Sequence, residues 1–141
     1  NAVDPSSTPE AILCVDDEGI ILMHLVMILK RKYGDRYRYE RASNAEEGLA
    51  VVERLESEGI RVGILITDWI MPGASGDEFV RALRAARPEL RAIVVSGKTD
   101  EAEIRKLGAE AGLAGFLSKP IVSEELFALI DRVEEDRRSG T

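Results

Sequence analysis

Short, nearly unbroken apolar runs alternate along the chain with longer stretches of helical periodicity. The three clearest runs are rich in Ile or Val and each stops at a polar residue; they span 11–15 (AILCV), 62–67 (VGILIT) and 92–96 (AIVVS). Such runs are typical of strands buried on both faces of a parallel sheet. Residues 114–118 form a weaker run. Residues 37–42 (YRYERA) alternate instead, which favours a half-exposed edge strand.

The stretches between the runs have the periodicity of amphipathic helices. Four of them combine apolar positions three or four residues apart with polar or acidic residues at their starts: 43–55, 76–87, 100–107 and 123–133. Ser43 and Glu46 have the spacing of a capping box, so we expect Ser43 to cap the first of these helices. The second ends before Pro88, which cannot continue a helix.

This order of elements predicts five β–α units in one α/β domain. Alternating strands and helices favour a parallel sheet with right-handed crossovers and helices on both faces, a flavodoxin-like doubly wound (βα)5 fold. The half-exposed second strand suits the edge of the sheet. We therefore expect the strand order 2-1-3-4-5. We expect a flexible segment over 1–9, the folded domain over 10–135 and a flexible, charged tail over 136–141.

The stretch from Ile20 to Leu29 is apolar in nearly every direction around a helix. An ordinary surface helix shows only a stripe. Two interpretations remain open: the helix is deeply packed, or its outer face docks helices of a partner or a second copy of the chain. His24 has no companion for a metal site. Cys14 is expected to be buried, and Trp69 to be a partly exposed flank.

Composition narrows the function classes. The chain has 19 Lys and Arg against 26 Asp and Glu, a formal net charge of −7. This charge argues against direct nucleic-acid binding and against attraction to an anionic membrane surface. The single cysteine excludes an internal disulfide, and one cysteine with one histidine disfavours thiolate or imidazole metal sites.

Polar side chains follow the apolar runs where each predicted strand ends. They are Asp16, Asp17, Glu18, Thr67, Asp68, Ser96, Ser118 and Lys119. Because the carboxyl ends of parallel strands meet at one edge, we expect these groups to converge there. Like charges about 4 Å apart repel by roughly 4 kcal/mol at an effective dielectric of 20, so clustered acids favour a cation. Hard oxygen ligands together with retained water molecules suit Mg²⁺. Among the acids, Asp68 is the best candidate nucleophile, because it ends the central apolar run.

Taken together, these motifs resemble the receiver domain of two-component response regulators. They are Asp16-Asp17-Glu18, Asp68 in TDWIMPGASG, Ser96 in VVSG, and Lys119-Pro120 in FLSKP, and the resemblance covers residues 10–134. It implies that Asp68 is the phosphoacceptor, with a sensor histidine kinase or a histidine phosphotransfer protein as donor. It also implies a cytoplasmic module that phosphorylates and dephosphorylates itself and is not a metabolic enzyme.

The resemblance further implies a role for each site residue. Mg²⁺ would be bound by Asp17, Asp68 and the Ile70 carbonyl, and by Asp16 through a water. Lys119 would hold a phosphoryl oxygen. Ser96 would hydrogen-bond the phosphoryl group, and Phe116 would act with Ser96 as a switch that alters the surface of the fourth helix, fifth strand and fifth helix.

Some positions depart from the common form of the family. Phe116 lacks the hydroxyl of the frequent Tyr, and Ser96 replaces the frequent Thr. Ile70 and Lys98 flank the path of the hydrolytic water, where the family varies and dephosphorylation is tuned. An apolar Ile70 cannot orient a water, so we expect slow hydrolysis of the phosphorylated form.

Two other function classes fit the sequence less well. An aspartyl-phosphate hydrolase of small phosphate esters needs a second acid two residues after its nucleophile, and Asp68 is followed by Trp69 and Ile70. A flavin or nucleotide binder would need a glycine-rich phosphate loop after the first strand. The output is expected to be a downstream protein partner or a covalently linked domain, with a homodimer as a further arrangement.

Overall fold

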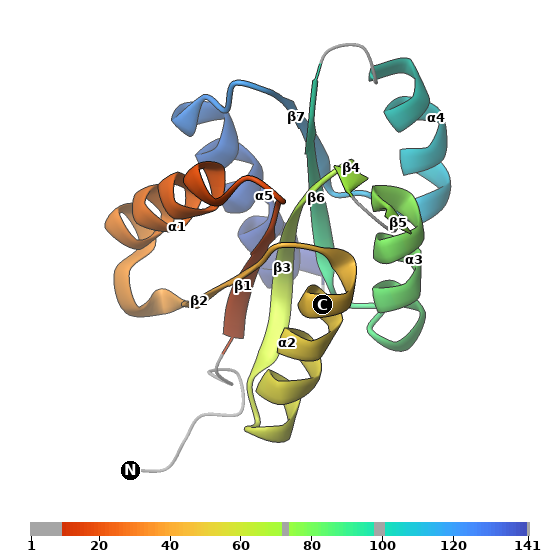
Figure 1. The fold of residues 1–141 in the computed structure, drawn as a ribbon. Helices are drawn as coiled ribbons and strands as arrows, with labels where there is room; N and C mark the ends of the chain where they lie inside the picture. Colours follow the sequence, from red (N-terminus) through yellow and green to blue (C-terminus); the bar gives the residue numbers. More distant parts are fainter. Residues whose placement is uncertain (1–9, 72–73, 98–100, 141) are drawn as a thin grey trace, which may run out of the picture.

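The computed structural model describes residues 10–71, 74–97 and 101–140. Five parallel strands form the main sheet in the order β2-β1-β3-β6-β7 (Figure 1). Their bounds are Glu10–Val15 for β1, Arg38–Ala42 for β2, Arg61–Asp68 for β3, Arg91–Ser96 for β6 and Gly115–Ser118 for β7. Counted along the main sheet, this is the order 2-1-3-4-5, so the predicted fold and strand order are confirmed.

Helices cover both faces of the sheet. On one face lie α1 (Gly19–Tyr33) and α5 (Ser123–Gly140), and on the other α2 (Ala45–Ser57), α3 (Gly76–Ala86) and α4 (Glu101–Ala111) (Figure 1). A short 3-10 turn, Gly34–Arg36, joins α1 to the edge strand β2. Within the described residues, no helix combines the length and apolar character needed to cross a membrane.

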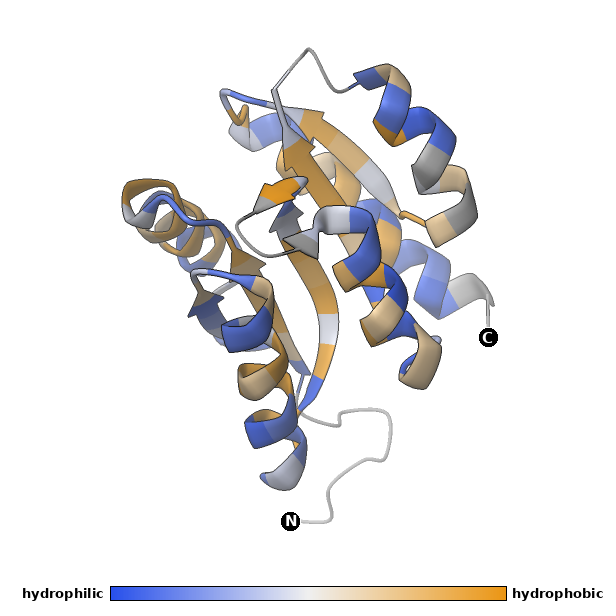
Figure 2. Ribbon diagram, turned by 45° about the vertical axis from the view of Figure 1, so that its right-hand side comes forward, coloured by the Kyte–Doolittle hydropathy of each residue, from blue (hydrophilic) through white to orange (hydrophobic). Residues whose placement is uncertain are grey.

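The apolar runs are unbroken because both faces of the inner strands are covered. In β1, Ala11, Leu13 and Val15 face α2 and α3, whereas Ile12 and Cys14 face α1 and α5. In Figure 2, where hydrophobic residues are orange, this colour is concentrated on the strands of the main sheet. Each fully buried Leu, Ile or Val side chain stabilises the fold by about 1.5–3 kcal/mol.

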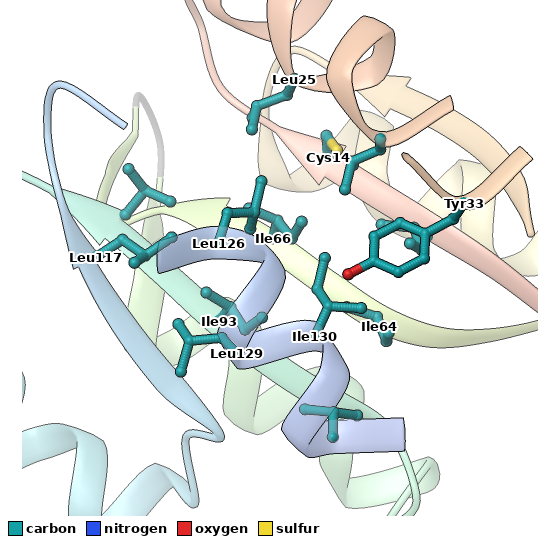
Figure 3. Close-up of a cluster of buried hydrophobic side chains, with 14 of the residues drawn as sticks. Cys14, Leu25, Tyr33, Ile64, Ile66, Ile93, Leu117, Leu126, Leu129 and Ile130 are labelled. Carbon is teal, nitrogen blue, oxygen red and sulfur yellow. The ribbon is translucent and has the colours of Figure 1, made fainter. Parts of the chain in front are cut away.

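The core between the sheet and the α1–α5 layer is aliphatic. Leu126, Leu129 and Ile130 of α5 pack against Ile64 and other strand residues (Figure 3). Cys14 lies in this core and is fully buried, as the sequence predicts. Burial raises the pKa of its thiol to about 12, so Cys14 is a protonated, unreactive core residue at neutral pH.

The predicted cap of α2 is wrong by one residue. Asn44, not Ser43, is the N-cap, and its Oδ1 accepts a hydrogen bond from the Glu47 N–H at 2.8 Å. The Glu47 carboxylate in turn accepts from the Ser43 N–H at 3.1 Å. Asn and Ser are about equally good N-cap residues, because both short side chains reach a free N–H of the first helical turn. The sequence pattern alone therefore does not decide between Ser43 and Asn44.

The last helix is longer than the sequence predicts. It continues to Gly140, past the expected domain end at residue 135. Arg137 anchors this end of the helix by donating to the Gly63 carbonyl at 2.6 Å and by pairing with Glu10. Because β1 and β3 shift register at Gly63, that carbonyl is available to a side chain. The predicted flexible segment 1–9 and residue 141 lie outside the described residues.

Candidate functional site

The carboxyl edge of the sheet brings two acids and one ammonium group into contact. Asp16 follows β1, Asp68 ends β3 and Lys119 follows β7. The Lys119 Nζ lies 3.2 Å from Asp16 Oδ2 and 3.3 Å from Asp68 Oδ2. Glu18 is more distant from the ammonium, at 3.8 Å, and mostly exposed. The convergence expected from the strand ends is therefore present for Asp16, Asp68 and Lys119.

Main-chain hydrogen bonds hold these side chains in position. The Lys119 N–H donates to the Ser96 carbonyl at 2.8 Å, which ties the end of β7 to the end of β6. The Lys119–Pro120 peptide bond is cis. On the opposite side, the Glu18 N–H donates to Asp16 Oδ1 at 2.9 Å and fixes that carboxylate at the start of α1.

Three carboxylates at this edge could hold a metal ion. One oxygen from each of Asp16, Asp17 and Asp68 lies within 4.8 Å of the other two. Asp16 and Asp68 are buried and Asp17 is exposed, so the cluster has a protein side and a solvent side. This donor set is made of hard oxygen atoms and is open to solvent at Asp17, which fits a small divalent cation.

The electrostatics of the site favour added positive charge. Burial and the nearby Asp16 charge raise the pKa of Asp68, and the Lys119 ammonium offsets only part of this effect. Burial lowers the pKa of Lys119, but the charges of Asp68 and Asp16 outweigh it and raise that pKa overall. Lys119 is therefore an ammonium at neutral pH, and a second cation would stabilise the ionised Asp68.

The segment after Asp68 is held by backbone contacts. The Trp69 N–H donates to the Val95 carbonyl at 3.1 Å, and the Gly76 N–H donates to the Trp69 carbonyl at 2.7 Å. A Cβ atom on Gly76 would approach backbone atoms of Trp69 to 2.9 Å, so only glycine fits there. Gly76 was not predicted to matter; its only sequence signal is a glycine at the start of a helical pattern.

A short hairpin follows β3, the strand that ends at Asp68. Ile70–Met71 (β4) pairs antiparallel with Ala74–Ser75 (β5). The Ile70 N–H donates to the Asp68 carboxylate, and its side chain is 63% exposed beside the site. Pro72 and Gly73 of the predicted turn lie outside the described residues, as does Lys98, and the predicted role of Lys98 stays a prediction.

Trp69 is buried, contrary to the partly exposed position predicted for it. Its side chain is 2% exposed and packs with Val94 and Ile104, and the partly buried Phe116 packs against the same cluster. The prediction was wrong because α4 covers this side of the strand end, a contact that no local pattern reveals. Ser96 is buried at the end of β6. The side chain after Asp68 thus connects the acidic site to α4 and β7.

Comparison with known proteins identifies the family. A family model described as the response regulator receiver domain matches residues 12–131. The chain belongs to the response regulator receiver domain family. It is 30% identical over 126 residues to the chemotaxis protein CheY of Pseudomonas aeruginosa, a match that spans 88% of this chain and 95% of CheY. Receiver domains are modules of two-component signalling.

Other relatives contain this domain as one part. The chain is 32% identical over 124 residues to the sensor kinase CckA of Brucella abortus, covering 88% of this chain but 12% of CckA. It spans 25% of the hydrogenase transcriptional regulatory protein HoxA of Cupriavidus necator and 48% of a probable transcriptional regulatory protein of Picosynechococcus. Among solved structures, a CheY-like receiver domain protein from Methanospirillum hungatei superposes with a TM-score of 0.78 at 27% identity, covering 92% of this chain and 98% of that one.

Proposed function

We propose that Asp68 accepts a phosphoryl group from a phosphohistidine on a sensor histidine kinase or a histidine phosphotransfer protein. An Asp68 carboxylate oxygen attacks phosphorus, the new O–P bond forms as the N–P bond breaks, and the imidazole nitrogen leaves with the electron pair. The observation that carries this proposal is the Lys119 ammonium 3.3 Å from Asp68 Oδ2. The Lys119 charge can offset the negative charge on the oxygens of the phosphoryl group during transfer, as well as hold the Asp68 carboxylate in place.

The acidic cluster supports Mg²⁺ as the cofactor. In this proposal Asp17, Asp68 and the Ile70 carbonyl would hold the ion directly, and Asp16 would hold it through a water. When bound, the ion supplies positive charge that offsets the charge on the phosphoryl oxygens. Asp16 also keeps Lys119 in reach of the phosphoryl group, because its Oδ2 lies 3.2 Å from the ammonium.

Ser96 and Phe116 are proposed to transmit the phosphorylated state. The Ser96 hydroxyl, at the end of the strand beside β3, would donate to a phosphoryl oxygen and draw the end of β6 towards Asp68. Phe116 packs against the cluster of Trp69, Val94 and Ile104, so movement at the strand end changes its packing. The altered surface would consist of α4, β7 and α5, and a downstream protein or a linked output domain would recognise it.

The donor protein is proposed to dock on α1 beside the site. Ile20 is 79% exposed, which excludes the interpretation of α1 as a fully packed helix. A pocket of about 500 Å³ lies between α1 and the segment after β7, lined by Ile20, His24, Lys119 and Ile121 among others. An apolar surface next to the nucleophile suits a donor that must deliver its phosphohistidine there, in the cytoplasm where such kinases phosphorylate their partners.

Labelling with a small phosphodonor tests this proposal. The chain is incubated with radiolabelled acetyl phosphate, with and without Mg²⁺, alongside Asp68→Asn and Asp17→Asn. We expect Mg²⁺-dependent label that alkali releases, none on Asp68→Asn, and slower labelling of Asp17→Asn. Label that persists on Asp68→Asn would contradict the proposal. Multiple turnover of a small phosphate ester would instead favour the hydrolase interpretation.

A further inference from the structure

A second groove beside α1 shares no lining residue with the Lys119 pocket. It occupies about 550 Å³ between α1 and β2, and its apolar wall includes Met23 and Met27, which are 58% and 47% exposed. Since β2 is the edge of the sheet, no strand of the described chain covers this side. In Figure 2, α1 carries hydrophobic colouring along much of its surface.

The floor of the groove is fixed by hydrogen bonds. The Tyr39 ring lines it, and the Tyr39 hydroxyl donates to the Gly34 carbonyl at 2.8 Å, which ties β2 to the end of α1. The two methionines above it are flexible and polarisable, so they can adapt to the shape of an incoming apolar side chain. The groove therefore combines a rigid base with an adaptable apolar wall.

The rim of the groove is positively charged although the chain is not. Lys30 and Arg41 line it, and neither forms an ion pair with another residue in the described ranges. The one acid at the rim, Glu40, is already neutralised, because Arg38 and Arg54 each contact its carboxylate at 2.9 Å. The net charge of the chain is −7, yet Lys30 and Arg41 carry positive charge beside two exposed methionines. This local charge and apolar surface are complementary to an acidic, partly apolar partner.

We propose that this groove binds an acidic amphipathic helix of a partner protein. Apolar side chains at helical spacing would fill the space against Met23 and Met27, and carboxylates on the flank of that helix would pair with Lys30 and Arg41. The groove shares no lining residue with the pocket beside Lys119, so this contact is separate from delivery of a phosphoryl group. The partner helix can therefore bind whether or not Asp68 is phosphorylated.

A charge-swap experiment with designed peptides tests the proposal. The probe is a fluorescently labelled helical peptide with Leu at positions i, i+3, i+4 and i+7 and Glu on both flanks; a matched peptide has Lys in place of Glu. We expect the Glu peptide to bind the full chain at least tenfold more tightly, with affinity falling as salt rises. The double variant Lys30→Glu/Arg41→Glu should reverse this preference, and Met23→Ser/Met27→Ser should weaken binding of the Glu peptide at least tenfold.

The matched control is Lys106→Glu/Arg132→Glu, which changes the net charge equally at exposed positions elsewhere. It should keep the preference of the parent, and so should Asp68→Asn, which separates this proposal from the phosphoacceptor role. Equal binding of both peptides, an unreversed preference in the Lys30/Arg41 variant, or reversal in the control would overturn the proposal. Self-association of the chain that the groove variants abolish would also overturn it, because the occupant would then be a second copy.

Discussion

The backbone N–H of Gly76 donates to the Trp69 carbonyl at 2.7 Å, and a Cβ atom on Gly76 would lie 2.9 Å from Trp69 Cα. The start of α3 is therefore pressed against Trp69, the residue that follows Asp68. This contact fixes the backbone on which Asp68 and the hairpin after it depend. Its geometry tolerates no side chain at position 76.

Gly76→Ala should both destabilise the fold and disturb the site. The added methyl meets backbone atoms, which cannot rotate away, so we expect a loss of about 1–3 kcal/mol in the free energy of unfolding. Displacement of Trp69 should slow labelling by acetyl phosphate about tenfold. Denaturant unfolding and initial labelling rates measure the two effects. Gly19→Ala is the control, since its Cβ would enter open space; an equal loss in both variants would contradict the argument.

Removal of the Lys119 charge should have opposite effects on metal binding and on phosphorylation. In Lys119→Met, Asp16 and Asp68 lose the ammonium 3.2 and 3.3 Å away, so their attraction for a divalent cation rises. We expect Mg²⁺ affinity to increase about tenfold and labelling of Asp68 to fall sharply. Titration followed by Trp69 fluorescence gives the affinity. Lys106→Met, on the exposed side of α4, should change neither quantity, and weaker Mg²⁺ binding by Lys119→Met would refute this account of the site.

Asp68→Asn should stabilise the domain when Mg²⁺ is absent. Burial and the Asp16 charge raise the pKa of Asp68, so ionisation of this group opposes folding. The native state then binds more protons at this site than the unfolded state, and the cost appears as pH rises above the ordinary carboxyl range. We expect a gain on the order of 1 kcal/mol at pH 7 that shrinks at pH 4 and on addition of Mg²⁺. Thermal unfolding across this pH range measures it, and a gain that grows at pH 4 would reverse the argument.

Tyrosines that anchor α5 should make the fold sensitive to alkali. Tyr33 donates to Asp131 at 2.9 Å and Tyr37 donates to Glu134. Burial and these acids raise the pKa of both phenols above their usual value of 10. The unfolded chain therefore loses phenolic protons first, and the stabilisation is complete below pH 10 and lost as pH rises further. Unfolding measured from pH 8 to 11 should show this decline, and Tyr33→Phe/Tyr37→Phe should flatten it; an unchanged slope in that variant would refute the assignment.

Ile70 should slow loss of the phosphoryl group. Its side chain is 63% exposed next to Asp68 and offers no polar atom to orient an attacking water. We expect Ile70→Asn to lose radiolabelled phosphate several-fold faster than the parent chain, with Ile70→Val unchanged. If the parent loses label as fast as the Asn variant, Ile70 does not limit access of water.

The sequence predicts the sheet because its signals are local to each strand. Unbroken Ile and Val runs report burial on both faces, and the polar residue after each run reports the edge where the site assembles. Asp16, Asp68 and Lys119 were accordingly predicted together. Burial of Trp69 depends on where α4 lies, which no nearby pattern encodes.

Two further features depend on contacts between distant segments or on small local differences. The end of α5 is held by Arg137 against Glu10 and Gly63, far away in sequence, so composition alone suggested a fraying tail. The choice of Asn44 over Ser43 as helix cap depends on one residue of register. The groove at β2 required three-dimensional placement of Lys30 and Arg41 on different elements.

Identification of the phosphorylated residue tests the central claim most directly. After incubation with acetyl phosphate and Mg²⁺, borohydride reduces the acyl phosphate carbonyl to an alcohol, so a phosphorylated aspartate is recovered as homoserine in peptide sequencing. The account predicts homoserine at position 68 alone, and none when Mg²⁺ is omitted. Homoserine at position 16 or 17, or none at any position despite incorporated phosphate, would contradict it.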